Sequence, residues 1–211
     1  MYEGEQPVYP DFIIPGGALT DGLEEDFEYT IYQQGVKLTP SADGKTYLTA
    51  CAPYFKREGN RFCSHRYTPS AHGEAYPAAV GNDNVIVFAH PLFAQYRDCA
   101  PSWVKTIMKN AIRMMLGAQL VTHDGASTVS VNLLRKDDKT YAHILTYIPV
   151  RKSATIDIIE ERTAAYNLTL TVTLPEGFAS ARIVPENIPL TVNGSSITLP
   201  VVDGYAIVEL Y

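Results

Sequence analysis

The pattern of hydrophobic and polar positions along the chain changes near residue 120. In the segment 127–134, STVSVNLL, Val129, Val131 and Leu133 fall on one side and polar residues on the other, a period typical of a half-buried strand. Further short segments are rich in β-branched residues and end at turn sequences. These segments are 141–148, 154–159, 168–174, 181–185, 196–202 and 206–210. The pattern predicts an all-β, immunoglobulin-like sandwich domain over residues 120–211.

The first part of the chain has a different pattern. Two strand-like segments, 27–38 and 45–55, precede NVIVFAH (84–90), a continuous apolar run typical of a strand covered on both faces. The segment 101–116 then repeats apolar residues at helical spacing. A buried strand followed by an amphipathic helix predicts α/β packing, but a single helix covers only one face of such a sheet. We therefore expect an incomplete α/β domain over residues 1–119.

Charge and cysteine usage narrow the classes of function. The chain has 211 residues and a formal net charge of −6, without a basic block, so nucleic-acid binding is not expected. No apolar stretch is long enough to span a membrane, and the acidic N-terminal segment does not resemble a secretory signal. The odd number of cysteines, Cys51, Cys63 and Cys99, argues against a disulfide framework and predicts a cytoplasmic protein.

The segment 61–69, RFCSHRYTP, concentrates reactive side chains. Cys63 and His65, together with His72 and His90, have the thiolate and imidazole groups that bind zinc. However, the Cys-x-His spacing is uncommon among zinc sites, and no second ligand motif accompanies it. Hydrogen-bonded histidines and a small buried thiol are the simpler interpretation, and we expect no metal.

Catalysis within this chain is the second hypothesis. Cys63 could act as a nucleophile with His65 or His90 as its base, and Arg61 and Arg66 lie close enough in sequence to lower the pKa of the thiol. However, no nucleophile elbow and no helix start lie at this position. The acidic clusters 24–28 and 157–161 follow turns and lack the setting of a glycosidase acid pair. We therefore assign no catalytic residue.

Aromatic residues are frequent in two segments, 53–62 and 88–96. They lie close in sequence to His90, Gln95 and Tyr96. Rings combined with imidazole and amide groups suit the stacking and hydrogen bonding of sugars, and they equally suit a packed subunit interface. The sequence leaves both interpretations open.

Three segments carry a resemblance to a known group of enzymes. PYFKREGNRFCSHRYTP (53–69), YPAAVGNDNVIVFAHPLFAQYRDCAPSW (76–103) and HILTYIPVRKSATIDIIEE (143–161) resemble the C-terminal part of bacterial glycoside hydrolases. These are related to family 42 β-galactosidases and to the hypothetical glycosyl hydrolase 6 group, which includes α-L-fucosidases. The resemblance runs from about Asp11 to Leu210.

The resemblance implies a fold and a role. Such enzymes have a (β/α)₈ barrel, then a trimerisation domain with a glutamine amidotransferase-like, flavodoxin-like fold, then a β-sandwich. The chain would contain part of the α/β domain and the sandwich, an α+β arrangement. The catalytic acids of these enzymes lie on the barrel, which this chain lacks. The chain would thus be a non-catalytic portion that serves oligomer assembly and shapes the sugar pocket.

The resemblance also implies partners and site residues. The expected partners are further copies of the chain, a (β/α)₈ barrel in the same or another chain, and an oligosaccharide; no cofactor is expected. A stand-alone carbohydrate-binding or protein-interaction module is the alternative, and an enzyme that uses Cys63 is a third hypothesis. The residues expected at a subunit interface or at the wall of a sugar pocket are Cys63, His65, Arg66, His90, Gln95 and Tyr96.

Overall fold

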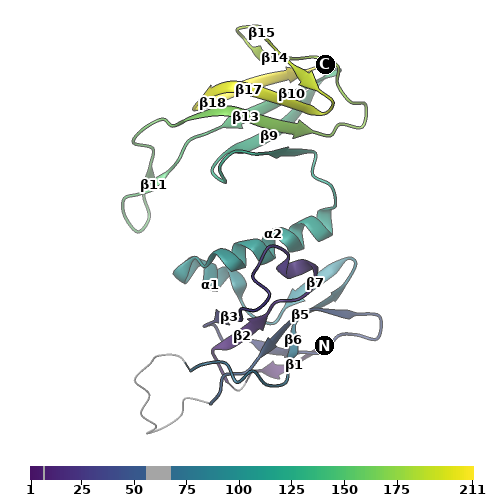
Figure 1. Cartoon of the computed structure of the whole chain (residues 1–211), viewed down its shortest axis with the longest axis vertical. Helices are drawn as coiled ribbons and strands as arrows, with labels where there is room; N and C mark the ends of the chain where they lie inside the picture. The colour runs from purple at the N-terminus through teal and green to yellow at the C-terminus, as the bar shows by residue number, and fades with distance from the viewer. Residues whose placement is uncertain (7, 56–67) are drawn as a thin grey trace. The chain divides into compact units, whose positions relative to one another are not determined.

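A computed structural model describes residues 1–6, 8–55 and 68–211. The chain divides into two compact units, Met1–Gly117 and Ala118–Tyr211, and each has its own hydrophobic core. Figure 1 shows the elements of both units.

The first unit is built around a five-stranded antiparallel sheet with the strand order β3-β2-β5-β6-β7, and β1 pairs with β4 in a second, small sheet. Its strands are β1 (Tyr2–Glu5), β2 (Asp11–Ile14), β3 (Tyr29–Ile31), β4 (Val36–Leu38), β5 (Lys45–Cys51), β6 (Tyr76–Asn82) and β7 (Val85–Phe88). Its helical elements are the short 3-10 turn η1 (Ala18–Thr20), α1 (Leu92–Cys99) and α2 (Ser102–Leu116).

The helix predicted over 101–116 is observed as α2, and it supplies one side of the core of this unit. Its buried side chains Trp103, Val104, Ile107 and Ala111 cluster with apolar residues of β2, β3, β5 and β6. The shorter helix α1, which contacts α2, was not predicted from the sequence (Figure 1). Neither helix of the described residues is long and apolar enough to cross a membrane.

The predicted flavodoxin-like α/β fold of residues 1–119 is wrong. A flavodoxin-like domain has a parallel sheet with crossover helices, whereas the strand pairs of this sheet are antiparallel. The apolar run 84–90 misled the prediction, because β7 is an edge strand in which Val85 is 52% and Val87 is 45% exposed. It forms a hairpin with β6, and the side-chain oxygen of Asn82 accepts the amides of Asn84 and Val85 at its turn.

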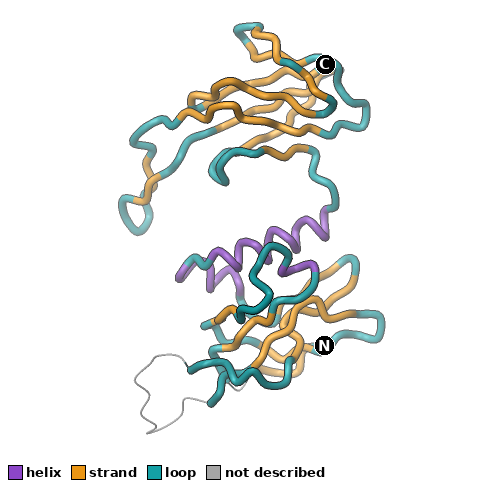
Figure 2. Tube along the Cα trace, in the orientation of Figure 1, coloured by secondary structure: helices purple, strands orange, loops and turns teal. Residues whose placement is uncertain are grey.

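The second unit contains two antiparallel sheets with the orders β15-β14-β18-β10-β9 and β16-β17-β13-β8. Figure 2 shows the strands of this unit in orange. Its core is formed by side chains of both sheets, which confirms the predicted β-sandwich. A separate hairpin of β11 and β12 extends from the sandwich (Figure 1). The strands are β8 (Val121–His123), β9 (Ser130–Lys136), β10 (Lys139–Leu145), β11 (Val150–Arg151), β12 (Asp157–Ile158), β13 (Ala164–Val172), β14 (Ala181–Val184), β15 (Ile188–Leu190), β16 (Val192–Asn193), β17 (Ser196–Asp203) and β18 (Tyr205–Leu210).

Candidate functional site

The structure describes half of the residues that the sequence analysis selected. Cys63, His65 and Arg66 lie outside the described residues. His90 and Gln95 are buried in the first unit, and Tyr96 on α1 is 39% exposed. The candidate site is therefore built from the surroundings of His90 and Gln95.

His90 forms a buried pair with Asp11. The His90 Nε2 and Asp11 Oδ2 atoms are 2.6 Å apart, and the two side chains are 1% and 0% exposed. Asp11 begins β2, and His90 follows β7. The preceding residue, Ala89, is held on both sides, because its amide donates to the carbonyl of Ala78 and its carbonyl accepts the amide of Val36. These backbone bonds place the imidazole where its Nε2–H donates to the carboxylate.

Gly35 leaves the space that the His90 ring fills. A Cβ at position 35 would lie 2.5 Å from His90 Cδ2 and 2.6 Å from its Nε2. We expect Gly35→Ala to displace the ring from Asp11 and to lower the free energy of unfolding by about 1–3 kcal/mol, as overpacking does. Denaturant unfolding measures this change, with Gly73→Ala as the control because its new methyl would meet only Ala71, at 3.8 Å. Equal stability of the two variants would show that the ring can move without cost.

Several buried polar atoms around this pair lack a hydrogen-bond partner among the described residues. They include Asp11 Oδ1, His90 Nδ1 and the hydroxyl of Tyr76. Burial, followed by the nearby charge of Asp11, raises the pKa of Tyr76, so its hydroxyl stays protonated. A carboxylate that orients an imidazole is an arrangement found in general bases. However, the buried ring cannot meet a substrate, so the pair serves as an internal polar anchor of the sheet.

A second polar cluster brings together residues from both sides of the segment 56–67. Cys51 Sγ lies 3.0 Å from Ser70 Oγ, and His72 Nδ1 lies 3.1 Å from Glu28 Oε1. Burial raises the pKa of the Cys51 thiol, which therefore remains neutral and weakly nucleophilic. Burial acts to raise the pKa of Glu28 too, but the hydrogen bonds from Ser70 and His72 outweigh it and lower that pKa. The described residues contain no group of three or more metal-ligating side chains placed to hold an ion.

Gln95 lies beside a pocket of aromatic side chains. Its Oε1 accepts the amide of Tyr32 at 3.0 Å, while its buried Nε2 has no partner in the described part of the chain. The pocket has a volume of about 310 Å³. Its main lining residues are Phe27, Tyr29, Tyr32, Gln95, Pro101 and Trp103. The structure thus places Gln95 next to aromatic rings, although the rings are not those of the segments 53–62 and 88–96.

Asp11, Tyr76 and the aromatic residues Phe27 and Tyr29 were not selected from the sequence. One signal was available for Asp11, which is a carboxylate directly before the apolar residues of β2. An acidic residue at the start of a buried strand needs a partner. The identity of that partner, His90, follows only from the fold.

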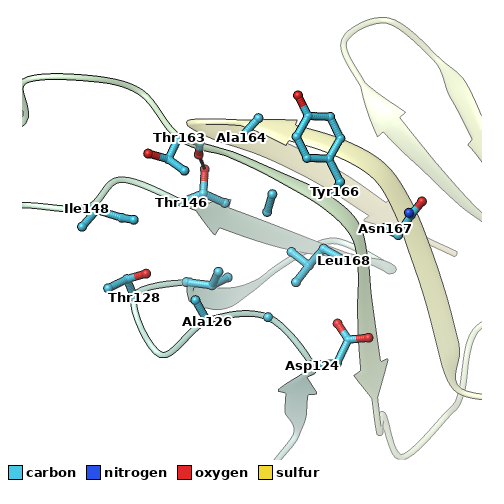
Figure 3. Close-up of a pocket in the computed structure, with 13 residues that line it drawn as sticks. Asp124, Ala126, Thr128, Thr146, Ile148, Thr163, Ala164, Tyr166, Asn167 and Leu168 are labelled. Atoms are coloured by element: carbon cyan, nitrogen blue, oxygen red, sulfur yellow. Dashed lines mark hydrogen bonds between the residues drawn. The ribbon is translucent and has the colours of Figure 1, made fainter.

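The second unit has a hollow of about 330 Å³ at one end of β13 (Figure 3). The hydroxyl of Thr146 donates to the carbonyl of Thr163, and Asp124 Oδ1 accepts the amide of Thr169, which lowers the pKa of Asp124. The ring of Tyr166 stands at the rim and is directed away from Leu168 (Figure 3). Because these polar groups are bonded within the fold or turned away, the hollow is a weaker ligand candidate than the aromatic pocket.

Comparison with known proteins identifies a solved structure with a similar fold. No protein-family model and no curated protein matches the sequence. Among solved structures, α-L-fucosidase isoenzyme 2 from Paenibacillus thiaminolyticus matches 99% of this chain with a TM-score of 0.83 and 24% sequence identity. This likeness shows the fold. The chain spans 33% of the length of that enzyme, so its fold is related to part of a glycoside hydrolase.

A second solved structure matches more weakly. The β-galactosidase from Bacillus circulans sp. alkalophilus matches 100% of this chain and 24% of its own chain, with 13% identity and a TM-score of 0.48.

Proposed function

We propose that this chain is a non-catalytic portion of a glycoside hydrolase of the α-L-fucosidase or β-galactosidase type. The observation that carries the proposal is the match of nearly the whole chain to one third of an α-L-fucosidase. In this proposal the chain serves assembly of the enzyme and shapes its sugar pocket, while the catalytic acids belong to a (β/α)₈ barrel.

The environment of the buried carboxylates supports a non-catalytic role. Hydrolysis of a glycosidic bond needs two carboxyl groups about 5–10 Å apart that face a shared cleft. Among the described residues the buried carboxylates are Asp11 and Glu209, which belong to different units. Asp11 is bonded to His90, and Glu209 is bonded to Lys139 and Arg182. Neither is placed to act on a sugar.

The role in assembly rests on the exposed surface of α1. Tyr96 presents an exposed ring on this helix, and aromatic side chains are enriched at subunit interfaces. In this proposal Tyr96, together with Cys63, His65 and Arg66, faces a second copy of the chain or the barrel. His90 and Gln95 act from the interior, where they hold the sheet and α1 in position. The unpaired thiols of Cys51 and Cys99 support a cytoplasmic location.

The coding frame upstream of the Met1 codon tests the proposal. We expect it to continue without a stop and to encode a (β/α)₈ barrel, which needs roughly 250 residues. The full-length product should then hydrolyse an aryl α-L-fucoside or an aryl β-D-galactoside, and light scattering after size exclusion should show an oligomer. A stop codon close upstream, together with a monomeric chain that no barrel subunit accompanies, would contradict the proposal.

A further inference from the structure

The aromatic pocket of the first unit has the features of a small ligand site. The rings of Phe27 and Tyr29 meet edge to face at 5.0 Å between centroids, and Tyr29 lies 5.8 Å from Trp103. Phe27 is 60% exposed at the opening of this row, while Trp103 at its other end is buried. The row therefore offers a ligand an accessible aromatic surface that leads towards the core.

Gln95 lines the pocket with a side-chain amide, and the polar residues Thr30 and Cys99 line it as well. The side-chain oxygen of Gln95 is occupied, because Oε1 accepts the amide of Tyr32. Its Nε2 is buried and has no partner among the described residues. A buried donor without an acceptor destabilises the fold, and a ligand oxygen beside Gln95 would supply the missing acceptor.

The lining of the pocket also limits the charge of its ligand. No charged side chain is among the described residues that line it. A carboxylate, phosphate or ammonium group would lose its hydration there without gaining a counter-charge. The lining therefore suits a neutral ligand that has an apolar face for the rings and an oxygen for Gln95.

We propose that this pocket binds one pyranose ring of a neutral sugar. A pyranose combines a face of C–H groups, which packs on aromatic rings, with hydroxyl oxygens that accept from an amide. The volume of about 310 Å³ is at the small end of the range of ligand pockets, roughly 300–1,000 Å³, and suits a single ring. This inference deepens the proposed function by naming a ligand and its contacts, and it rests on that function for the biological source of the sugar.

Trp103 makes the proposal directly measurable. It is the single tryptophan of the chain and it lines the pocket, so selectively excited tryptophan fluorescence reports on this site. We expect L-fucose or D-galactose, added to the intact chain, to change the fluorescence saturably, with a dissociation constant on the order of 1 mM. Glycerol at the same concentrations should leave it unchanged, because it has hydroxyl groups but no ring face.

Two exposed phenylalanines provide the variant and its matched control. Phe27→Ala removes the accessible ring of the pocket and should weaken sugar binding about tenfold, the loss expected when an aromatic stacking contact worth about 1.4 kcal/mol disappears. Phe93→Ala removes a similarly exposed ring from α1, outside the pocket, and should bind as the parent does. Because both rings are exposed, both variants should fold, which circular dichroism verifies.

The outcomes separate this inference from the proposed function. Linear or absent fluorescence changes with both sugars, the same change with glycerol, or equal weakening by Phe27→Ala and Phe93→Ala would each overturn the sugar pocket. A barrel encoded upstream would leave the proposed function standing in that case. Saturable, Phe27-dependent binding without such a barrel would instead support the pocket and contradict the proposed function.

Discussion

Replacing Asp11 with alanine is expected to lower the free energy of unfolding of the first unit by about 3–5 kcal/mol. The substitution removes the carboxylate that lies 2.6 Å from His90 Nε2 at a site where neither side chain is more than 1% exposed. The imidazole would keep its buried donor without an acceptor, and the space of the carboxylate would stay empty or fill with water. Both effects destabilise the same fold, because β2 and the end of β7 are joined through this pair.

Denaturant unfolding followed by the fluorescence of Trp103 measures this loss, since Trp103 lies in the core of the same unit. Asp11→Asn should cost less than Asp11→Ala, because its side-chain oxygen can still accept from His90. Asp26→Ala is the surface control and should change stability by no more than about 0.5 kcal/mol, because Asp26 is exposed. A stability of Asp11→Ala equal to that of the control would show that the pair is dispensable.

Elements were predicted correctly from the sequence where the residues that determine them lie close together in the chain. The alternation in 127–134 predicted a strand with one buried face, and β9 and the sandwich core have this character. The segment 101–116 carried a helical periodicity, so α2 was predicted to within a residue. In both cases the residues that decide the structure lie within one element.

The first unit was mispredicted where pairing decides the structure. A continuous apolar run such as 84–90 is compatible with a central parallel strand and with the edge of a hairpin, and periodicity cannot separate the two. The turn Asn82–Asp83–Asn84 held the missing information, because asparagine and aspartate at a short connection favour a hairpin. Giving this turn more weight would have predicted antiparallel pairing of β6 and β7.

The contacts of the candidate site were even less predictable from the sequence than the strand pairing. His90 and Gln95 were selected because rings and polar groups cluster near them in sequence. Their actual partners, Asp11 and Tyr32, are 79 and 63 positions away. Such contacts are created by the order of strands in the sheet, and a single sequence carries no local trace of them. The residue types could therefore be predicted, whereas the geometry that gives them a role could not.

The second large effect is expected at Glu209, the next-to-last residue of β18. Its Oε1 accepts from Lys139 at 2.8 Å and from Tyr141 at 3.0 Å, and its Oε2 accepts from Arg182. The ring of Tyr211 covers both cations, at 5.6 Å from Lys139 and 5.4 Å from Arg182. One carboxylate thus links β10, β14 and β18, and without it the two cations would repel each other.

The hydrogen bonds from Lys139, then those from Arg182 and Tyr141, lower the pKa of Glu209 from 4.5 to about 2. Since the folded pKa is below the unfolded one, the carboxylate stabilises the fold above pH 4.5, and this stabilisation is lost as the pH falls towards 2. Glu209→Gln should therefore lower the thermal midpoint of the second unit by several degrees at neutral pH. The difference between variant and parent should shrink as the pH falls through this window, because the protonated parent then resembles the variant.

Calorimetry over a series of pH values, with hydrogen exchange of the β10, β14 and β18 amides to assign the transition, tests this dependence. Glu176→Gln is the matched control, because Glu176 forms an exposed ion pair with Arg135, and such pairs contribute little to stability. It should leave the midpoint nearly unchanged at every pH. If the difference between Glu209→Gln and the parent stayed constant from neutral pH to pH 2, its cause would be altered packing in the sheet. A difference that vanishes with acid would instead identify the charge of Glu209 as the group that holds the three strands together.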